Sequence, residues 1–185
     1  MKRLHFADNT VLENFCRTRR LQLLEDLLDS RGTWTATVAV ECTASTRVTG
    51  LEDLVNVGGF LGEPISPETE DEFAAVQRHR EFLRIPGDGP EKHLGEAETL
   101  ALVELRSIHA IVLTDDTGAM RLANRLSISV ATTADLFRLA VRAERLDAQS
   151  AWDDLVSLQT EHHRFLPRAS PSFADLLAAC GGVVG

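Results

Sequence analysis

The sequence predicts an α/β fold in which a mainly parallel sheet is flanked by helices on both faces. The main observation is that short apolar stretches typical of strands alternate with stretches of helical periodicity as far as residue 131. The length of 185 residues suits one domain with its own hydrophobic core. An apolar content of 44% with 25% charged residues is ordinary for a globular protein and excludes a disordered or fibrous chain.

The strands of this sheet are identified by their composition. Residues 33–40 are rich in Thr and Val and contain a Trp, which favours a strand. Residues 110–113 form a short apolar run of the kind buried in parallel sheets. The expected strands are residues 3–7, 33–40, 110–113 and 128–131, whereas residues 50–62 give only a weak signal.

Helices are predicted where apolar residues recur every three or four positions, as at Leu21, Leu24 and Leu28. The expected helices lie at or near residues 11–15, 21–28, 70–84, 95–106, 117–126, 135–146, 150–162 and 173–179. Ser150 is the expected N-cap of the helix over 150–162. We expect residues 1–165 to form the domain and residues 166–185 to form a partly disordered tail, with its glycine-rich end frayed.

Composition and charge exclude several classes of protein. No stretch approaches the roughly 18 consecutive apolar residues that a membrane-spanning helix needs, and no signal-peptide region follows the amino terminus. These observations predict a cytoplasmic protein with no membrane partner. The three widely spaced cysteines exclude a disulfide framework and a thiolate zinc site. The net charge of −9 argues against binding nucleic acid by charge alone, so a phosphate substrate would require metal ions or local Arg clusters.

Acidic residues follow several of the predicted strands. Ligands of such α/β sheets bind outside the carboxyl ends of the strands. The acids expected at this edge are Asp8, Glu41, Asp115 and Asp116, and the first turn of the helix over 95–106 adds Glu96. Each of them alone is ordinary, because Asp often caps a helix and Glu suits a helix amino terminus. The prediction of a site therefore depends on whether these acids converge.

Convergence would limit what the acids can do. Two unit charges about 5 Å apart repel by roughly 3 kcal/mol at an effective dielectric constant near 20. Such a cluster either raises its pKa values or holds a divalent cation. Oxygen ligands without Cys or neighbouring His suit Mg²⁺ or Mn²⁺ rather than zinc. A bound ion would also activate water and neutralise a phosphodiester, which would explain how an acidic protein acts on nucleic acid.

Four segments carry further information in their order: residues 7–15 (ADNTVLENF), 38–41 (VAVE), 94–101 (LGEAETLA) and 111–116 (IVLTDD). In this order they resemble the PIN domain family, the nuclease fold of VapC-type toxins. Each motif alone is weak, but the ordered set is fairly specific, and the resemblance covers about residues 3–165. It departs from the family pattern at Asn9 and at Thr132-Thr133, and residues 50–90 match nothing in it.

The resemblance implies a three-layer α/β/α PIN-like fold and an Mg²⁺- or Mn²⁺-dependent endoribonuclease that cleaves RNA. Proteins of this family are often inhibited by a cognate antitoxin protein and are often homodimers. The family's first metal-binding acid corresponds to Asp8, the second to Glu41 and the third to Glu96. For the fourth, Asp115 and Asp116 both fit.

We therefore expect a metal-dependent ribonuclease, the toxin component of a toxin–antitoxin pair. Asp8, Glu96 and either Asp115 or Asp116 would hold the ion, and Glu41 would bind a second ion or orient the attacking water. One alternative is a catalytically inactive PIN-like module that binds nucleic acid or protein. The other, a haloacid-dehalogenase-like phosphatase, is disfavoured because residues 8–10 lack the second acid of its Asp-x-Asp motif.

Two groups of basic residues have both a functional and an ordinary interpretation. Arg121 and Arg125 are spaced i, i+4 and could bind phosphates near the acidic edge. Arg78, His79 and Arg80 begin a basic stripe, completed by residue 84, where a substrate or an antitoxin could dock. For both groups the ordinary interpretation, a solvated helix surface, is favoured over the functional one.

Overall fold

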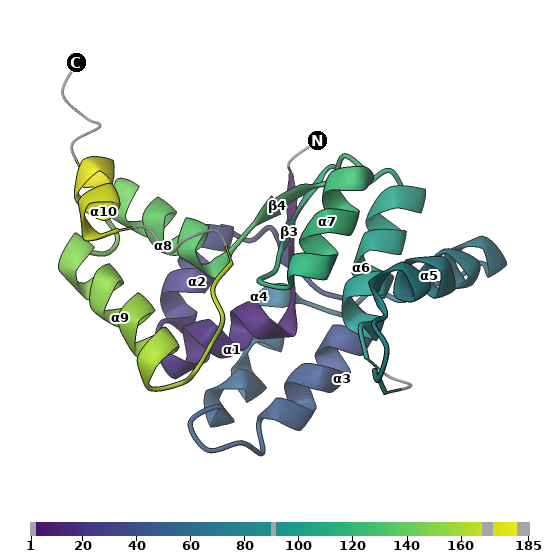
Figure 1. Cartoon of the computed structure of the whole chain (residues 1–185), viewed down its shortest axis with the longest axis horizontal. Coiled ribbons are helices and arrows are strands. Elements are labelled where there is room, and N and C mark those ends of the chain that lie inside the picture. Colours follow the sequence, from purple (N-terminus) through teal and green to yellow (C-terminus); the bar gives the residue numbers. More distant parts are fainter. Residues whose placement is uncertain (1–2, 90–91, 168–171, 181–185) are drawn as a thin grey trace.

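Four parallel strands form the centre of the fold in the computed structural model, which describes residues 3–89, 92–167 and 172–180. The strands are β1 (Leu4–Ala7), β2 (Gly32–Thr33), β3 (Ala110–Leu113) and β4 (Ser129–Ala131), arranged in the order β2-β1-β3-β4 (Figure 1). In the register of β1 and β3, Ala7 lies opposite Leu113. The two carboxyl ends are therefore side by side.

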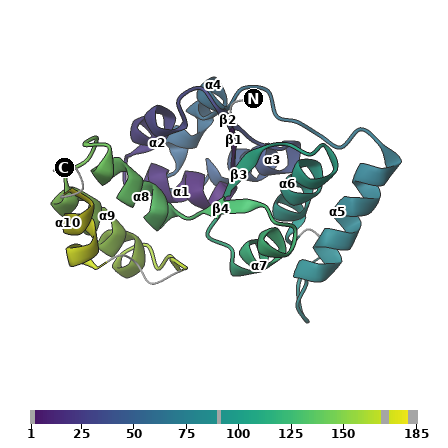
Figure 2. The ribbon, with the colours of Figure 1, turned by 90° about the horizontal axis from the view of Figure 1, so that it is seen from above.

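Helices cover both faces of this sheet, and the α/β fold class is confirmed. The helices are α1 (Asn9–Arg17), α2 (Leu21–Leu28), α3 (Ala36–Ser45), the 3₁₀ helix η1 (Glu52–Asn56), α4 (Gly58–Leu61), α5 (Glu70–Leu83), α6 (Leu94–Leu105), α7 (Thr117–Arg125), α8 (Thr133–Arg142), α9 (Ala148–Thr160) and α10 (Phe173–Cys180). Figure 2 shows α1, α2 and α8 on one side of the sheet and α5, α6 and α7 on the other.

The alternation of side chains along the strands divides the core into two parts. Phe6 and Val112 are buried with residues of α5, α6 and α7. Ala7 and Leu113 are buried with residues of α1, α2, α8 and α9. Successive residues of a strand point to opposite faces, so each of these short strands anchors both helical layers. This architecture is consistent with a three-layer α/β/α fold.

The predicted strand over residues 33–40 is wrong beyond Thr33. The chain leaves the sheet after β2 and forms α3, which contacts α1 and α6. Val38 and Cys42 are spaced i, i+4 and are fully or almost fully buried, while Val40 is 70% exposed. That is the burial pattern of a helix face. Packing between two helices has overridden the strand propensity of Thr and Val, so Glu41 is a helical residue and does not end a strand.

The other predicted elements lie close to their expected positions. In α5, Thr69 and Glu72 form a capping box that was not predicted. The predicted N-cap Ser150 is wrong, because the Asp147 carboxylate accepts a hydrogen bond from the Ser150 backbone N–H and caps α9 three residues earlier. Residues 50–62, where the sequence signal is weak, form η1 and α4.

Part of the predicted tail packs on the domain. α10 contacts α8 and α9, and Leu166 and Leu176 are buried in the core. The frayed glycine end predicted for residues 181–185 lies outside the described residues. Within the described part of the chain, no helix is long and apolar enough to cross a membrane.

Candidate metal centre

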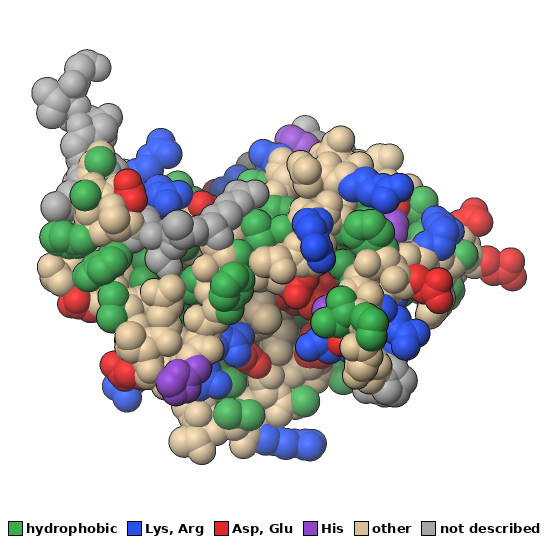
Figure 3. Space-filling view, viewed as in Figure 1, with side chains coloured by type: hydrophobic (Ala, Val, Ile, Leu, Met, Phe, Trp, Pro, Cys, Tyr) green, Lys and Arg blue, Asp and Glu red, His purple; other side chains and the backbone are tan. Residues whose placement is uncertain are grey.

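The strand order places a natural ligand site at the carboxyl ends of β1 and β3. From β1 the chain continues to β2 on one side, and later enters β3 on the other side of β1. Ligands of open α/β sheets bind where the strand order reverses in this way. Asp8 directly follows β1 and Asp116 begins α7 shortly after β3. Figure 3 shows acidic side chains recessed near the middle of this face of the molecule.

Asp8 is buried at the end of β1, with 5% of its surface exposed. Its carboxylate accepts hydrogen bonds from the hydroxyls of Thr10 and Thr114, the latter at 3.2 Å. Burial raises the pKa of Asp8, the two hydroxyl donors oppose that rise, and the nearby charge of Asp116 adds to it. The Asp8 carboxylate, held by residues after β1 and β3, is therefore unfavourable to ionise unless a cation is bound.

Glu41 reaches the same place from α3. A Cβ atom on Gly95 would lie 3.1 Å from both carboxylate oxygens of Glu41, so the missing side chain of this glycine makes room for the carboxylate. A second acid, Glu98, accepts hydrogen bonds from the backbone and the hydroxyl of Thr37 and ties α6 to α3. Burial, followed by the charge of Asp8, raises the pKa of Glu41 to about 7.

Glu96 lies in the first turn of α6, among the other acids. Burial is the largest cause of the rise in its pKa to about 8. The charges of Asp8, Asp116 and Glu41 raise it further. Because these charges act on one another, the carboxylates of Asp8, Glu41, Glu96 and Asp116 lie in one region although they come from four segments of the chain. This is the convergence on which the predicted site depends.

Asp115 and Asp116 point to different surroundings. Asp115 is 7% exposed, and its carboxylate accepts hydrogen bonds from Asn14 Nδ2 at 2.9 Å, from the backbone N–H of Thr133 at 2.9 Å and from the Thr133 hydroxyl. Asp116 accepts a hydrogen bond from the Ala119 backbone N–H at 2.6 Å and caps α7, while its charge acts on Asp8 and Glu96. Asp116 therefore belongs to the acidic cluster, and Asp115 joins β3 to α1 and α8.

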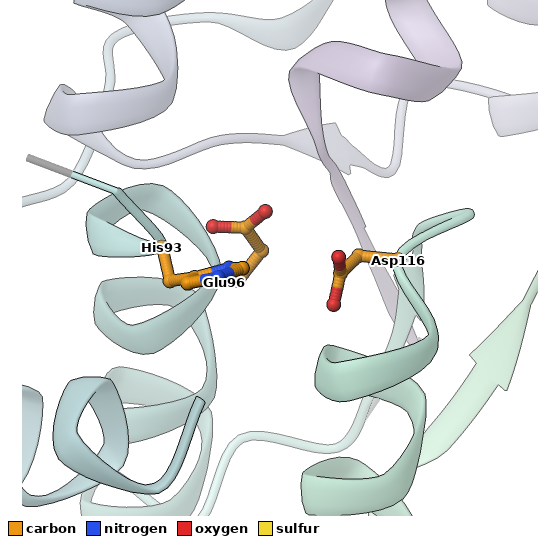
Figure 4. Close-up of side chains that lie close together, drawn as sticks. All are labelled: His93, Glu96 and Asp116. Atoms are coloured by element: carbon orange, nitrogen blue, oxygen red, sulfur yellow. The ribbon is translucent and has the colours of Figure 1, made fainter. Parts of the chain in front are cut away.

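One histidine of this region was missed in the sequence. Ligand atoms of His93, Glu96 and Asp116 all lie within 4.8 Å of one another, and Figure 4 shows the three side chains around a common space. The spacing of His93 and Glu96, three residues apart at the start of a predicted helix, is a signal that could have found it. The helix expected from the sequence begins at residue 95, which leaves His93 outside it.

A cleft of about 270 Å³ adjoins the acids. Its lining includes Thr10, Asp115 and Asp116 together with Arg164 and Phe165. Arg164 donates a hydrogen bond to Asn14 and pairs with Glu13 at 3.0 Å, whereas Phe165 is 72% exposed. A larger hollow of about 610 Å³ between α2 and α4 is lined by other acids and lies away from this centre.

Of the two basic groups, only His79 is withdrawn from the surface, because Arg78, Arg84, Arg121 and Arg125 are exposed. His79 is 7% exposed and its Nε2 lies 2.8 Å from Glu104, so this residue contributes little to a docking surface. The Arg125 guanidinium lies over the Phe82 ring, 5.6 Å from its centroid. Binding of phosphate or an antitoxin by these groups remains a prediction.

No protein-family model, characterised protein or solved structure matches this chain. The chemistry of the centre therefore follows from its geometry. Repelling, half-buried carboxylates with raised pKa values either keep protons at neutral pH or hold a divalent cation. A ligand set of carboxylates and one imidazole fits such an ion.

Proposed function

We propose that this protein is a divalent-metal-dependent endoribonuclease of the PIN type. The observation that carries the proposal is the gathering of Asp8, Glu41, Glu96 and Asp116 at the carboxyl ends of β1 and β3. A scaffold has no use for charges that repel one another in a half-buried place. The order of these acids in the sequence is also the order of the PIN family's metal-binding acids, which is the reason for proposing RNA cleavage rather than another hydrolysis.

In this proposal Glu96 and Asp116 are direct metal ligands, and Asp8 supplies a further negative charge close to the ion. The ion would neutralise the scissile phosphate and lower the pKa of a bound water. Glu41, whose pKa burial and the charge of Asp8 raise to about 7, is suited to accept a proton from the attacking water near neutral pH. Asp115 orders the strand end through its hydrogen bonds to Asn14 and Thr133.

The adjoining cleft supports a single-stranded substrate. The exposed ring of Phe165 offers a face on which a base can stack. Arg164, whose side chain is 25% exposed, also lines the cleft. A strand in this cleft would bring a phosphate to Asp116 while its bases remain outside the acidic centre.

The test is the substitution Glu96→Gln, which keeps the shape of the side chain and removes its charge. We expect Mn²⁺-dependent cleavage of a labelled single-stranded RNA to fall by roughly 100-fold or more, because a metal ligand and a charge in the transition state are lost. The matched control is Glu104→Gln on the same helix, which removes an exposed acid paired with His79. Equal cleavage by Glu96→Gln and the parent protein would refute the proposed function.

A further inference from the structure

We propose that His93 is a metal ligand and that it gives this centre a preference for Mn²⁺ over Mg²⁺. The inference rests on the proposed function and specifies the ion it uses. The inference adds a nitrogen ligand to the carboxylates. A site made of carboxylate oxygens alone would suit Mg²⁺ and Mn²⁺ alike.

The His93 ring is buried without the partners a buried imidazole needs. Its side chain is 10% exposed, and neither ring nitrogen has a hydrogen-bond partner among the described residues. Asp88 Oδ2 lies 3.2 Å from Nε2 and forms an ion pair with the protonated ring, which leaves Nδ1 without a polar partner among the described residues. Buried polar groups in native proteins are almost always satisfied, so Nδ1 requires a ligand.

At the start of α6 the contribution of His93 comes from its backbone, whose carbonyl accepts a hydrogen bond from the Ala97 N–H at 3.1 Å. His93 is the residue before α6, but its side chain makes no capping hydrogen bond there, and its φ of +63° is a left-handed conformation that non-glycine residues rarely adopt. N-cap residues ordinarily have extended backbone. This conformation instead places a ring nitrogen within 4.8 Å of ligand atoms of Glu96 and Asp116, as Figure 4 illustrates.

Ligand chemistry then separates the two ions. Mg²⁺ takes oxygen ligands and keeps several waters, whereas imidazole nitrogen is a ligand of first-row transition-metal ions. The two carboxylates keep the site suitable for Mn²⁺, which accepts oxygen ligands as well. Asp88, beside the ring, is placed as the carboxylate that orients a metal-bound histidine.

The experiment is calorimetric titration of the metal-free protein with MnCl₂ and, separately, with MgCl₂, comparing the parent with His93→Gln. We expect the parent to bind Mn²⁺ at least about 10-fold more tightly than Mg²⁺, and His93→Gln to weaken Mn²⁺ binding by about 10-fold or more with little change for Mg²⁺. His109→Gln, which removes an exposed histidine at the other end of β3, is the control and should change neither affinity.

Pulsed electron paramagnetic resonance of the Mn²⁺-loaded parent protein tests the same ligand without a substitution. We expect ¹⁴N coupling from one imidazole, and its loss in His93→Gln. No ¹⁴N coupling, or equal weakening of both ions by His93→Gln, would overturn the assignment of His93 and leave the proposed function standing. If the parent binds neither ion, both the assignment and the proposed function fail.

Discussion

At the scale of single residues, burial dominates the electrostatics of this centre. It is the largest cause of the raised pKa values of Asp8, Glu41 and Glu96, and for Glu41 and Glu96 the charge of Asp8 comes second. Hydrogen bonds from the hydroxyls of Thr10 and Thr114 favour the ionised form of Asp8 and oppose the effect of burial on its pKa. Without a cation, the folded protein therefore holds protons that the unfolded chain would release.

The metal-free protein is expected to lose stability as the pH rises through neutrality. Glu41 and Glu96 have folded pKa values of about 7 and about 8 against an ordinary 4.5. A carboxyl with a raised pKa binds more protons in the folded state, so the free energy of unfolding falls from about pH 4.5 to about pH 8 and then levels off. Urea denaturation across this range measures it. The paired substitution Glu41→Gln and Glu96→Gln should flatten the profile, and a flat profile in the parent would contradict these pKa values.

At the scale of helices, α3 and α6 form the wall that carries two of the acids. Glu41 and Glu96 come from different helices, and their approach depends on the close contact at Gly95. A Cβ atom at this position would also lie 3.1 Å from Val38 Cγ2. Glu98 and Thr37 hold the two helices together on the same side. The centre is thus built from rigid elements, which is what a metal site needs for fixed ligand positions.

The substitution Gly95→Ala should disturb the centre more than the fold. The added methyl would crowd both Glu41 oxygens and displace that carboxylate, so we expect RNA cleavage to fall by about 10- to 100-fold. The free energy of unfolding should change little, because alanine stabilises a helix by up to about 1 kcal/mol relative to glycine and the crowding of Glu41 and Val38 offsets this gain. Gly59→Ala, with no atom within 4 Å of its Cβ, is the control in α4. Unchanged cleavage by Gly95→Ala would show that Glu41 has no part in the reaction.

At the scale of the whole molecule, the site depends on the strand order. β1 lies between β2 and β3, and the acids that follow β1 and β3 meet because those strands are neighbours in register. The helices α3 and α6 then close the centre from the side. Segments as distant as residues 8 and 116 contribute to one site, so metal binding and global folding must be linked.

That linkage separates a nuclease from a PIN-like scaffold that binds without cleaving. An ion that binds only the folded protein raises its free energy of unfolding, by about 2.7 kcal/mol at an ion concentration 100 times the dissociation constant. We expect thermal or urea unfolding of the parent to show such a gain with Mn²⁺, and the paired Glu96→Gln and Asp116→Asn variant to show none. An unchanged midpoint in the parent protein would favour the scaffold.

The sequence by itself determined the α/β class, most helices and strands, and the acids that surround the candidate centre. These features follow from local causes: apolar periodicity, turn residues and the acids that begin helices, as at Asp8 and Glu96. The failure at residues 33–40 has a tertiary cause, since Thr and Val there favour a strand locally while the burial of Val38 and Cys42 against neighbouring helices requires a helix.

Only the tertiary structure decided which side chains share the centre. Asp115 and Asp116 are adjacent in sequence, but Asp115 is held by Asn14 and Thr133 through packing between distant elements, whereas Asp116 caps its own helix at Ala119. His93 joins Glu96 and Asp116 through a left-handed backbone residue that no periodicity predicts. Such choices arise from contacts between segments far apart in the chain, which the local pattern of residues does not encode.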